Sequence, residues 1–414
     1  MLVAAGHPAR AAVHLSRCLD LFAREGLTPS PALRAAALAL GPAPPTGLRA
    51  GVVARSLLRA GNAALDAGSA DAGVETLRQA AREARRARDP QVLAEVLAAL
   101  GSALVHAVRG LDGEGAVVLN QALAAARAAG QPGPAADILR ELGFVDLQAG
   151  RHASAGRALD EAWDQADGDP ALRARILAVQ GMNEADQGRH DTAVRLLARS
   201  ARASAAADRP RQQAWSTGVM ARSLLLAGQV EQARQAAEES MTICERERWP
   251  AFVPWPQALR AHCLDAAGHH DEARDDAEQA FALACQLGDP CWEGVAGRAL
   301  AVLALRRGDD AAAGQWIRDA QQRCDRLPDR WVWMSGFVRL GHLEIAARYQ
   351  PGLVLPLARR LYQAALRSDL PEFVAWALVY QAETGDPAPL PLARSVAAGV
   401  VSPALHTRLA ALGA

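Results

Sequence analysis

The side chains that could do chemistry in this sequence are a mixed set of aromatic and charged residues, most of them in its middle. They would offer stacking surfaces, guanidiniums, an imidazole and a carboxylate to an extended peptide or a polar small molecule. The alternative is that the aromatic members fill gaps between helices and that the charged members are merely solvated. The set, which we predict to face one groove, comprises Arg140, Trp215, Arg222, Trp255, His262, Asp265 and Arg298.

Histidine, cysteine and acidic residues do not form the pattern of a metal site or a catalytic centre. His269, His270 and Asp271 are adjacent, but no tetrahedral ligand set of the usual spacing goes with them, and polar residues recur at this point of other repeats. The sequence also lacks a GxSxG elbow, an HExxH pair, an EF-hand loop and a GxGxxG turn after a strand. We therefore expect no enzyme activity, no cofactor and no metal.

All 45 basic residues are arginine, because the sequence contains no lysine. This excludes chemistry that needs a P-loop lysine or a Schiff-base lysine. The 45 acidic residues balance the arginines, so no net charge attracts nucleic acid or an anionic bilayer. Neither a signal peptide nor a charge-free apolar stretch of about 18 residues occurs. We expect a cytoplasmic protein without a membrane partner.

The elements that must position these side chains recur along the chain. A helical run ends in a glycine turn, and an alanine-rich second helix follows. Neighbouring turn glycines are 38 to 42 residues apart, which indicates a structural period. These glycines are Gly68, Gly110, Gly150, Gly188, Gly228, Gly268 and Gly308.

Three positions of each repeat keep a small residue, as the close approach of two helices requires. Glycine or alanine stands seven residues before and five residues after every turn glycine, and alanine or serine stands twelve residues after it. A larger apolar residue usually recurs nine residues after the turn, as at Leu77, Leu159 and Leu197. We expect it to fill the core of each hairpin.

This order of small and large positions resembles the tetratricopeptide repeat over roughly residues 51–330. The period near 40 residues is longer than the usual ~34, and the tryptophan, tyrosine and terminal proline of that repeat are mostly missing. The resemblance implies an all-α superhelical solenoid of about seven helical hairpins with a helical C-terminal cap. Stacked hairpins of this kind bend around a concave groove.

The N-terminal segment has a different resemblance. A glycine-led helix is followed by the step Gly-Leu-Thr-Pro-Ser-Pro at residues 26–31 and by a further helix. This text is similar to the end of the bacterial transcriptional activator domain found in SARP-type regulators of actinobacteria. The resemblance implies that the chain is the C-terminal region of such a regulator, in which a winged-helix domain absent from this sequence would contact DNA.

We accordingly divide the chain into four parts: an activator-domain remnant (1–40), a Pro/Gly linker (41–50), a repeat array (51–350) and a C-terminal cap (351–414). The leading hypothesis is a ligand-sensing or protein-interaction region of a cytoplasmic transcriptional regulator. The alternative is a free-standing scaffold that binds a protein partner and has no role in transcription. In both cases a protein partner or a small-molecule effector would occupy the groove.

One stretch departs from the repeat pattern. Residues 249–256 contain two tryptophans, a phenylalanine and three prolines. Such a stretch suits a docking surface or lid. It equally suits a hydrophobic plug between two repeats, which we slightly favour.

Overall fold

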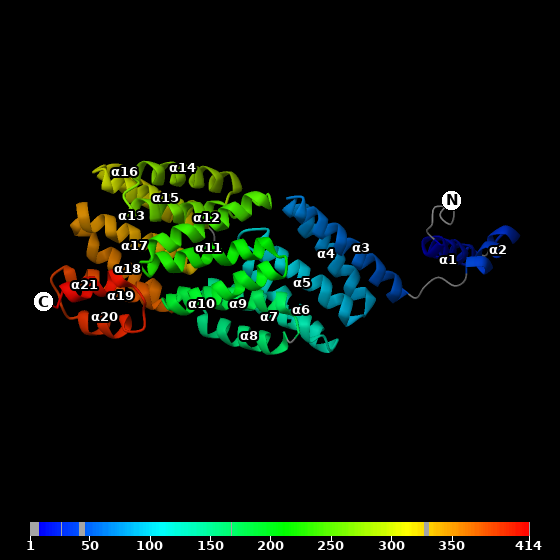
Figure 1. Cartoon of the computed structure of the whole chain (residues 1–414). Helices are drawn as coiled ribbons and strands as arrows, with labels where there is room; N and C mark the ends of the chain where they lie inside the picture. The colour runs from blue at the N-terminus through cyan, green and yellow to red at the C-terminus, as the bar shows by residue number, and fades with distance from the viewer. Residues whose placement is uncertain (1–7, 26, 41–45, 167, 327–330, 414) are drawn as a thin grey trace.

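The computed structural model describes residues 8–25, 27–40, 46–166, 168–326 and 331–413, and every regular element in these ranges is a helix (Figure 1). The elements are α1 (Pro8–Arg24), α2 (Pro31–Leu40), α3 (Thr46–Asp66), α4 (Ala70–Ala87), α5 (Pro90–His106), α6 (Asp112–Ala128), α7 (Pro132–Gln148), α8 (His152–Gln165), α9 (Pro170–Asp186), α10 (His190–Ala206), α11 (Pro210–Leu226), α12 (Val230–Arg246), α13 (Pro254–Ala266), α14 (His270–Leu287), α15 (Pro290–Arg306), α16 (Asp310–Cys324), α17 (Val332–Tyr349), the 3-10 turn η1 (Pro351–Leu353), α18 (Val354–Arg367), α19 (Pro371–Glu383), α20 (Leu390–Ala397) and α21 (Pro403–Ala411).

The turn glycines join the two helices of each hairpin, as predicted. Hairpins run from α3–α4 to α15–α16, and the seven glycines lie between their paired helices. Each of these glycines has a φ between 75° and 89°, in the left-handed region that glycine adopts without a Cβ penalty. The period in the sequence therefore marks where the chain reverses.

The small positions explain how the paired helices approach each other. A Cβ placed on Gly143 would lie 2.9 Å from Cγ of Leu159 on the partner helix, so the leucine occupies the space that the glycine leaves. Where serine replaces alanine on the second helix, its hydroxyl finds an acceptor. Ser200 Oγ donates to the carbonyl oxygen of Ala174 at 2.7 Å, and Ser240 Oγ donates to that of Ala214 at 2.8 Å.

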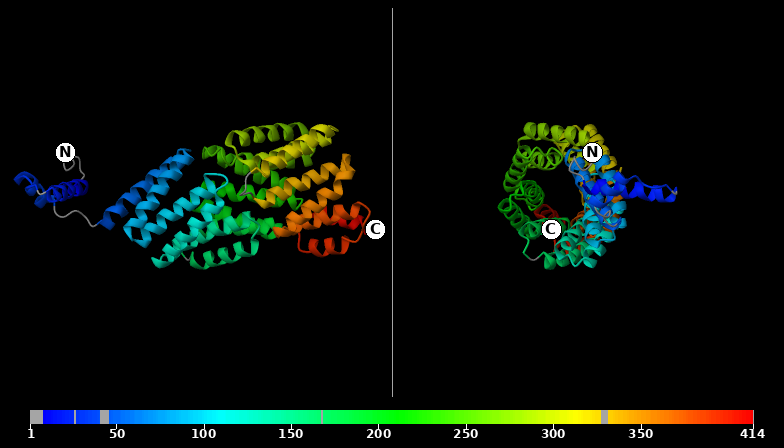
Figure 2. Two further views of the ribbon diagram at one scale, coloured as in Figure 1. Left: turned by 180° about the vertical axis from the view of Figure 1, so that it is seen from behind. Right: turned by 90° about the vertical axis from the view of Figure 1, so that its right-hand side faces the viewer.

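The stacked hairpins form a superhelix whose successive turns touch. Viewed along the long axis, the helices are arranged in a ring (right-hand view of Figure 2). The turns before α6, α8 and α10 contact segments that follow 180 or more residues later in the sequence. We call this line of contact the seam. It includes the ion pair Arg109–Asp289, the close approach of Gly150 to Ser368, and a hydrogen bond of 2.9 Å from Val401 N–H to the carbonyl oxygen of Gly188.

The two ends depart from the predicted divisions in detail. The α1–α2 pair stands apart from the array (Figure 1). Helix α3 begins at Thr46, so the last five residues of the predicted linker are helical, and residues 41–45 lie outside the described ranges. After residue 350, α18 packs against both α17 and α19, and α20 packs against α19. The C-terminal segment lies along the seam and contacts the middle hairpins, instead of only covering the last one.

No described helix is both long enough and apolar enough to cross a bilayer. The acidic residues, histidines and cysteines of the described ranges also form no cluster of three or more that could hold a metal ion.

Candidate functional site

An aromatic cavity of about 360 Å³ lies where residues of α5, α7, α9 and α11 meet residues 249–255, the start of α15 and Trp331, which precedes α17. Five of the chain's nine tryptophans line it, although aromatic residues make up only 4% of the sequence. We call this space the tryptophan cavity. Its aromatic walls are Phe144, Trp215, Trp249, Phe252, Trp255, Trp292 and Trp331.

Backbone acceptors hold two of the indoles in place. Trp255 Nε1–H donates to the carbonyl oxygen of Gly218 at 3.0 Å, and Trp292 Nε1–H donates to that of Ala251 at 3.1 Å. The two rings are 5.2 Å apart between centroids, a spacing typical of attractive aromatic pairs. Trp255 is almost fully buried, whereas Trp215, Trp249 and Trp292 are partly exposed. The cavity therefore has a rigid wall and an accessible aromatic rim.

The stretch 249–256 both packs into the interior and lines the cavity. Phe252 is buried and lies against Gly218, as the plug interpretation requires. Trp249 stacks on Phe252 with 5.0 Å between ring centroids and stays partly exposed at the cavity rim. The packing of Phe252 agrees with the plug interpretation, and a docking role for this stretch stays a prediction.

The polar groups at the cavity are few. Arg109 pairs with Asp289 across the seam, and His106 Nε2 lies 2.7 Å from a carboxylate oxygen of Glu141. Burial raises the pKa of the Cys291 thiol to about 12, so this cavity residue stays protonated and is a poor nucleophile at neutral pH. The arrangement suits stacking and apolar binding, and it offers one cationic side chain for orientation.

Two of the seven predicted groove residues, Trp215 and Trp255, line the cavity. Arg222 is instead buried, because the next turn of the superhelix covers it. Its Nη1 lies 2.7 Å from Oδ1 of Asp186, and its guanidinium lies 4.1 Å from the ring centroid of Trp333. Trp331 Nε1–H donates to the second oxygen of Asp186 at 2.7 Å. Burial lowers the pKa of Arg222, although the Asp186 charge opposes the shift.

His262 and Arg298 meet on Phe337 of α17, away from the tryptophan cavity. The Arg298 guanidinium lies 3.8 Å from the Phe337 ring centroid and donates to Glu344 at 2.9 Å. His262 meets the same ring edge-on, with 6.0 Å between centroids. Burial, assisted by the Arg298 charge, lowers the pKa of His262 to about 3, so this imidazole is neutral at physiological pH.

The remaining two predicted residues take part in ion pairs. Asp265 accepts hydrogen bonds from Arg306 Nε at 2.6 Å and from His270 Nδ1 at 2.9 Å. Arg140 Nη2 donates to Glu141 at 2.6 Å. The arginines and the aspartate of the predicted groove are therefore already in ion pairs within the protein. His262 carries no charge at physiological pH.

Sequence reasoning did not single out Trp292 and Trp331, which complete the cavity. Trp292 lies at the start of α15 and Trp331 directly precedes α17, so neither is at a recurring position of the repeat. The sequence signal that could have indicated them is the clustering of tryptophans, most of which fall between residues 215 and 333.

Comparison with solved structures identifies the fold of the chain. No protein-family model matches the sequence, and no curated protein does. A solved Rap protein in complex with Competence and Sporulation Factor is similar in structure, with a TM-score of 0.63, 11% identity, and coverage of 87% of this chain and 99% of that one. The chain has a tetratricopeptide-like repeat fold. Weaker similarities include aspartyl phosphate phosphatase F from Bacillus subtilis (TM-score 0.49, 11% identity, coverage of 84% and 94%) and a signal transduction ATPase with a tetratricopeptide repeat sensor from Pyrococcus horikoshii (0.46, 13%, 80% and 51%).

Proposed function

We propose that the protein is a non-catalytic scaffold that binds an extended peptide segment of a partner in the tryptophan cavity. The observation that carries the proposal is the convergence of five tryptophans on one cavity enclosed by the superhelix. Aromatic pockets of this size bind apolar and aromatic groups, and a few polar contacts set their orientation. The similar Rap protein was solved with Competence and Sporulation Factor bound, which supports the use of this fold for holding a partner.

The accessible tryptophans of the rim are the residues to test. Peptides selected from a random display library on the full chain should be rich in aromatic and apolar residues. Trp215→Ala combined with Trp249→Ala should weaken their binding by about tenfold or more, because removing buried aromatic contacts costs about 2 kcal/mol or more at binding hot spots. Fluorescence anisotropy with a labelled peptide measures the change.

Trp163→Ala is the matched control, because Trp163 is also partly exposed but lies outside the cavity on α8. This variant should bind the selected peptides as the wild type does. Equal affinity of the wild type and the double variant would refute the cavity as the binding site. Arg222 is unsuitable for this test, because its loss would disturb the buried contacts with Asp186.

We further propose that the scaffold serves a cytoplasmic transcriptional regulator. Support comes from the resemblance of residues 1–40 to an activator-domain end, and from the separate α1–α2 pair. DNA would be contacted by a winged-helix domain outside residues 1–414. The free-standing scaffold remains the second candidate, and the genomic sequence upstream of the coding region distinguishes the two, because a regulator requires a winged-helix sequence in the same reading frame.

A further inference from the structure

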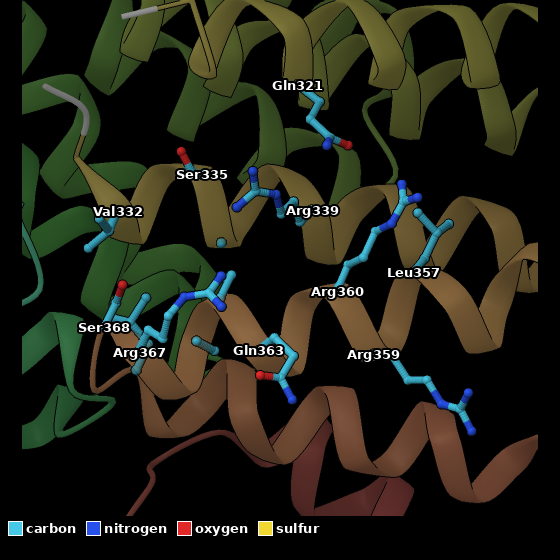
Figure 3. A pocket seen from close by; sticks show the side chains of 14 residues that line it. Gln321, Val332, Ser335, Arg339, Leu357, Arg359, Arg360, Gln363, Arg367 and Ser368 are labelled. Atoms are coloured by element: carbon cyan, nitrogen blue, oxygen red, sulfur yellow. The ribbon is translucent and has the colours of Figure 1, made fainter. Parts of the chain in front are cut away.

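A second cavity, of about 570 Å³, lies between α16 and α18 with α17 as its floor (Figure 3). It shares no lining residue with the tryptophan cavity. Four arginines line it: Arg339 from α17, and Arg359, Arg360 and Arg367 from α18. We call it the arginine groove.

The arginine groove carries uncompensated positive charge. None of its lining residues is acidic, although the whole chain has as many acidic as basic residues. Arg359, Arg360 and Arg367 take part in no ion pair within the described ranges. A cleft lined by charges of one sign concentrates the field and attracts counter-ions. The groove is therefore suited to an anion.

The side chains of the groove converge from different helices. Arg360 and Arg367 are seven residues apart and so lie on one face of α18. Figure 3 shows Arg339 and Arg367 extending into the same space and Arg360 reaching toward α16 further along the groove, whereas Arg359 points away. Arg339 is held by two contacts of its Nη2 to Asp325, at 3.0 and 2.9 Å. Among the described residues, no partner accepts a hydrogen bond from its Nε or Nη1.

Two neutral groups add donors to the same space. The side-chain oxygen of Gln321 accepts from His342 Nδ1 at 3.0 Å, so the Gln321 amide nitrogen is left to donate into the groove. Ser335 is 4% exposed, and its hydroxyl has no hydrogen-bond partner among the described residues. A buried hydroxyl without a partner is costly, and a ligand oxygen would satisfy it.

The donor set indicates which anion fits. Several guanidiniums match a tetrahedral oxyanion with two or more charges better than a single carboxylate, because each planar fork can contact two ligand oxygens. No aromatic residue lines the groove, so it lacks the stacking surface that single-stranded nucleic acid or a nucleobase requires. The chemistry favours a phosphoryl group recognised by itself.

We propose that the arginine groove binds a phosphoryl group through Arg339, Arg360 and Arg367. The site is independent of the peptide binding proposed for the tryptophan cavity. The phosphoryl group can belong to a free polyphosphate compound or to a phosphorylated protein segment, and both present the same oxyanion to the guanidiniums.

Titration calorimetry of the full chain with inorganic pyrophosphate at low ionic strength tests the proposal. Arg360→Gln combined with Arg367→Gln should reduce the affinity at least tenfold. Both arginines are exposed, so the double variant should keep the helical circular dichroism of the wild type. Added salt should weaken binding to the wild type, because exposed charge contacts are screened.

Arg348→Gln is the matched control, because Arg348 is exposed on α17, takes part in no described ion pair and does not line the groove. It should bind pyrophosphate as the wild type does. Equal affinities of the wild type and the double variant, or no binding at millimolar pyrophosphate, would overturn the proposal.

Two further probes identify the source of the phosphoryl group. Binding of ATP as tight as that of pyrophosphate supports a free polyphosphate ligand. Tighter binding of phosphoserine peptides than of pyrophosphate supports a phosphorylated segment. If unphosphorylated peptides rich in glutamate bind as tightly as either, the phosphoryl specificity is refuted.

Discussion

Inside a hairpin, Gly143 lies against Leu159, and the contact joins a small and a large apolar residue. Between repeats, Asp186 on α9 instead pairs with Arg222 on α11 and accepts a hydrogen bond from Trp331, and the contact is ionic and aromatic. The small positions of the hairpins recur in every repeat, whereas this contact occurs once. The comparison indicates that shape complementarity builds the superhelix and that particular polar groups fix how its turns meet.

The largest effect is expected from breaking the buried ion pair between Asp186 and Arg222. Asp186→Asn leaves the buried Arg222 guanidinium without its counter-charge, and such a loss destabilises proteins by about 3–5 kcal/mol. Urea denaturation of the variant measures the change in unfolding free energy. Asp146→Asn is the control, because Asp146 pairs with the exposed Arg151, and it should cost about 1 kcal/mol or less. Similar losses in both variants would show that the buried pair contributes no more to stability than an exposed one.

A smaller effect is expected from crowding a hairpin. The Cβ of Gly143→Ala would lie 2.9 Å from Leu159 Cγ, and overpacking of this kind costs about 1–3 kcal/mol. Gly133→Ala, on the same helix, adds a Cβ that meets nothing within 4 Å, and alanine there should be neutral or stabilising by up to about 1 kcal/mol. Thermal denaturation of the two variants compares them directly. A stable Gly143→Ala variant would contradict the packing role of the small positions.

The smallest expected effect is on the pH dependence of stability. Apolar hairpin contacts do not titrate, whereas the buried His262 can. Folding lowers the pKa of His262 from its ordinary value near 6.5 to about 3, so the unfolded chain binds the proton first as pH falls. The stability that depends on a neutral His262 is fully present above about pH 6.5. Lowering the pH from 6.5 to 5.5 should reduce the free energy of unfolding by about 1 kcal/mol through this residue.

His262→Gln should remove that component of the pH dependence, measured as unfolding free energy between pH 7.5 and 5.5. His269→Gln, which changes an exposed histidine of a hairpin turn, should leave the pH dependence of the wild type in place. Parallel pH profiles of the wild type and His262→Gln would show that the imidazole titrates normally.

The hairpins could be predicted from the sequence because their contacts are local and periodic. Gly61 and Leu77, which touch in the structure, stand at fixed distances from Gly68 in the sequence. The seam has no such signal, since Val401, which contacts Gly188, is far from it in the chain and belongs to no repeated pattern. The sequence pattern therefore could not show that Trp331 and Trp333 cover Arg222, whereas the cavity that Trp215 lines remains a predicted binding site.

The arginine groove lay beyond the reach of the same reasoning for a different reason. Arg360 and Arg367 come after the predicted repeat array, which ends at residue 350. Nothing in their spacing shows that Arg339 and Gln321 face them. Their convergence depends on how α16 and α18 stack on α17, which is a property of the tertiary structure.

The seam also changes how this protein should come apart. An ordinary solenoid frays from its ends, one repeat at a time, because each repeat touches only its neighbours. Here, contacts such as Gly188 with Val401 and His190 with Glu372 tie the middle of the chain to its C-terminal segment. That segment cannot melt without also exposing the middle hairpins, and so the C-terminal half should unfold as one cooperative unit. The α3–α4 hairpin, which makes no seam contact within the described ranges, is where fraying should start.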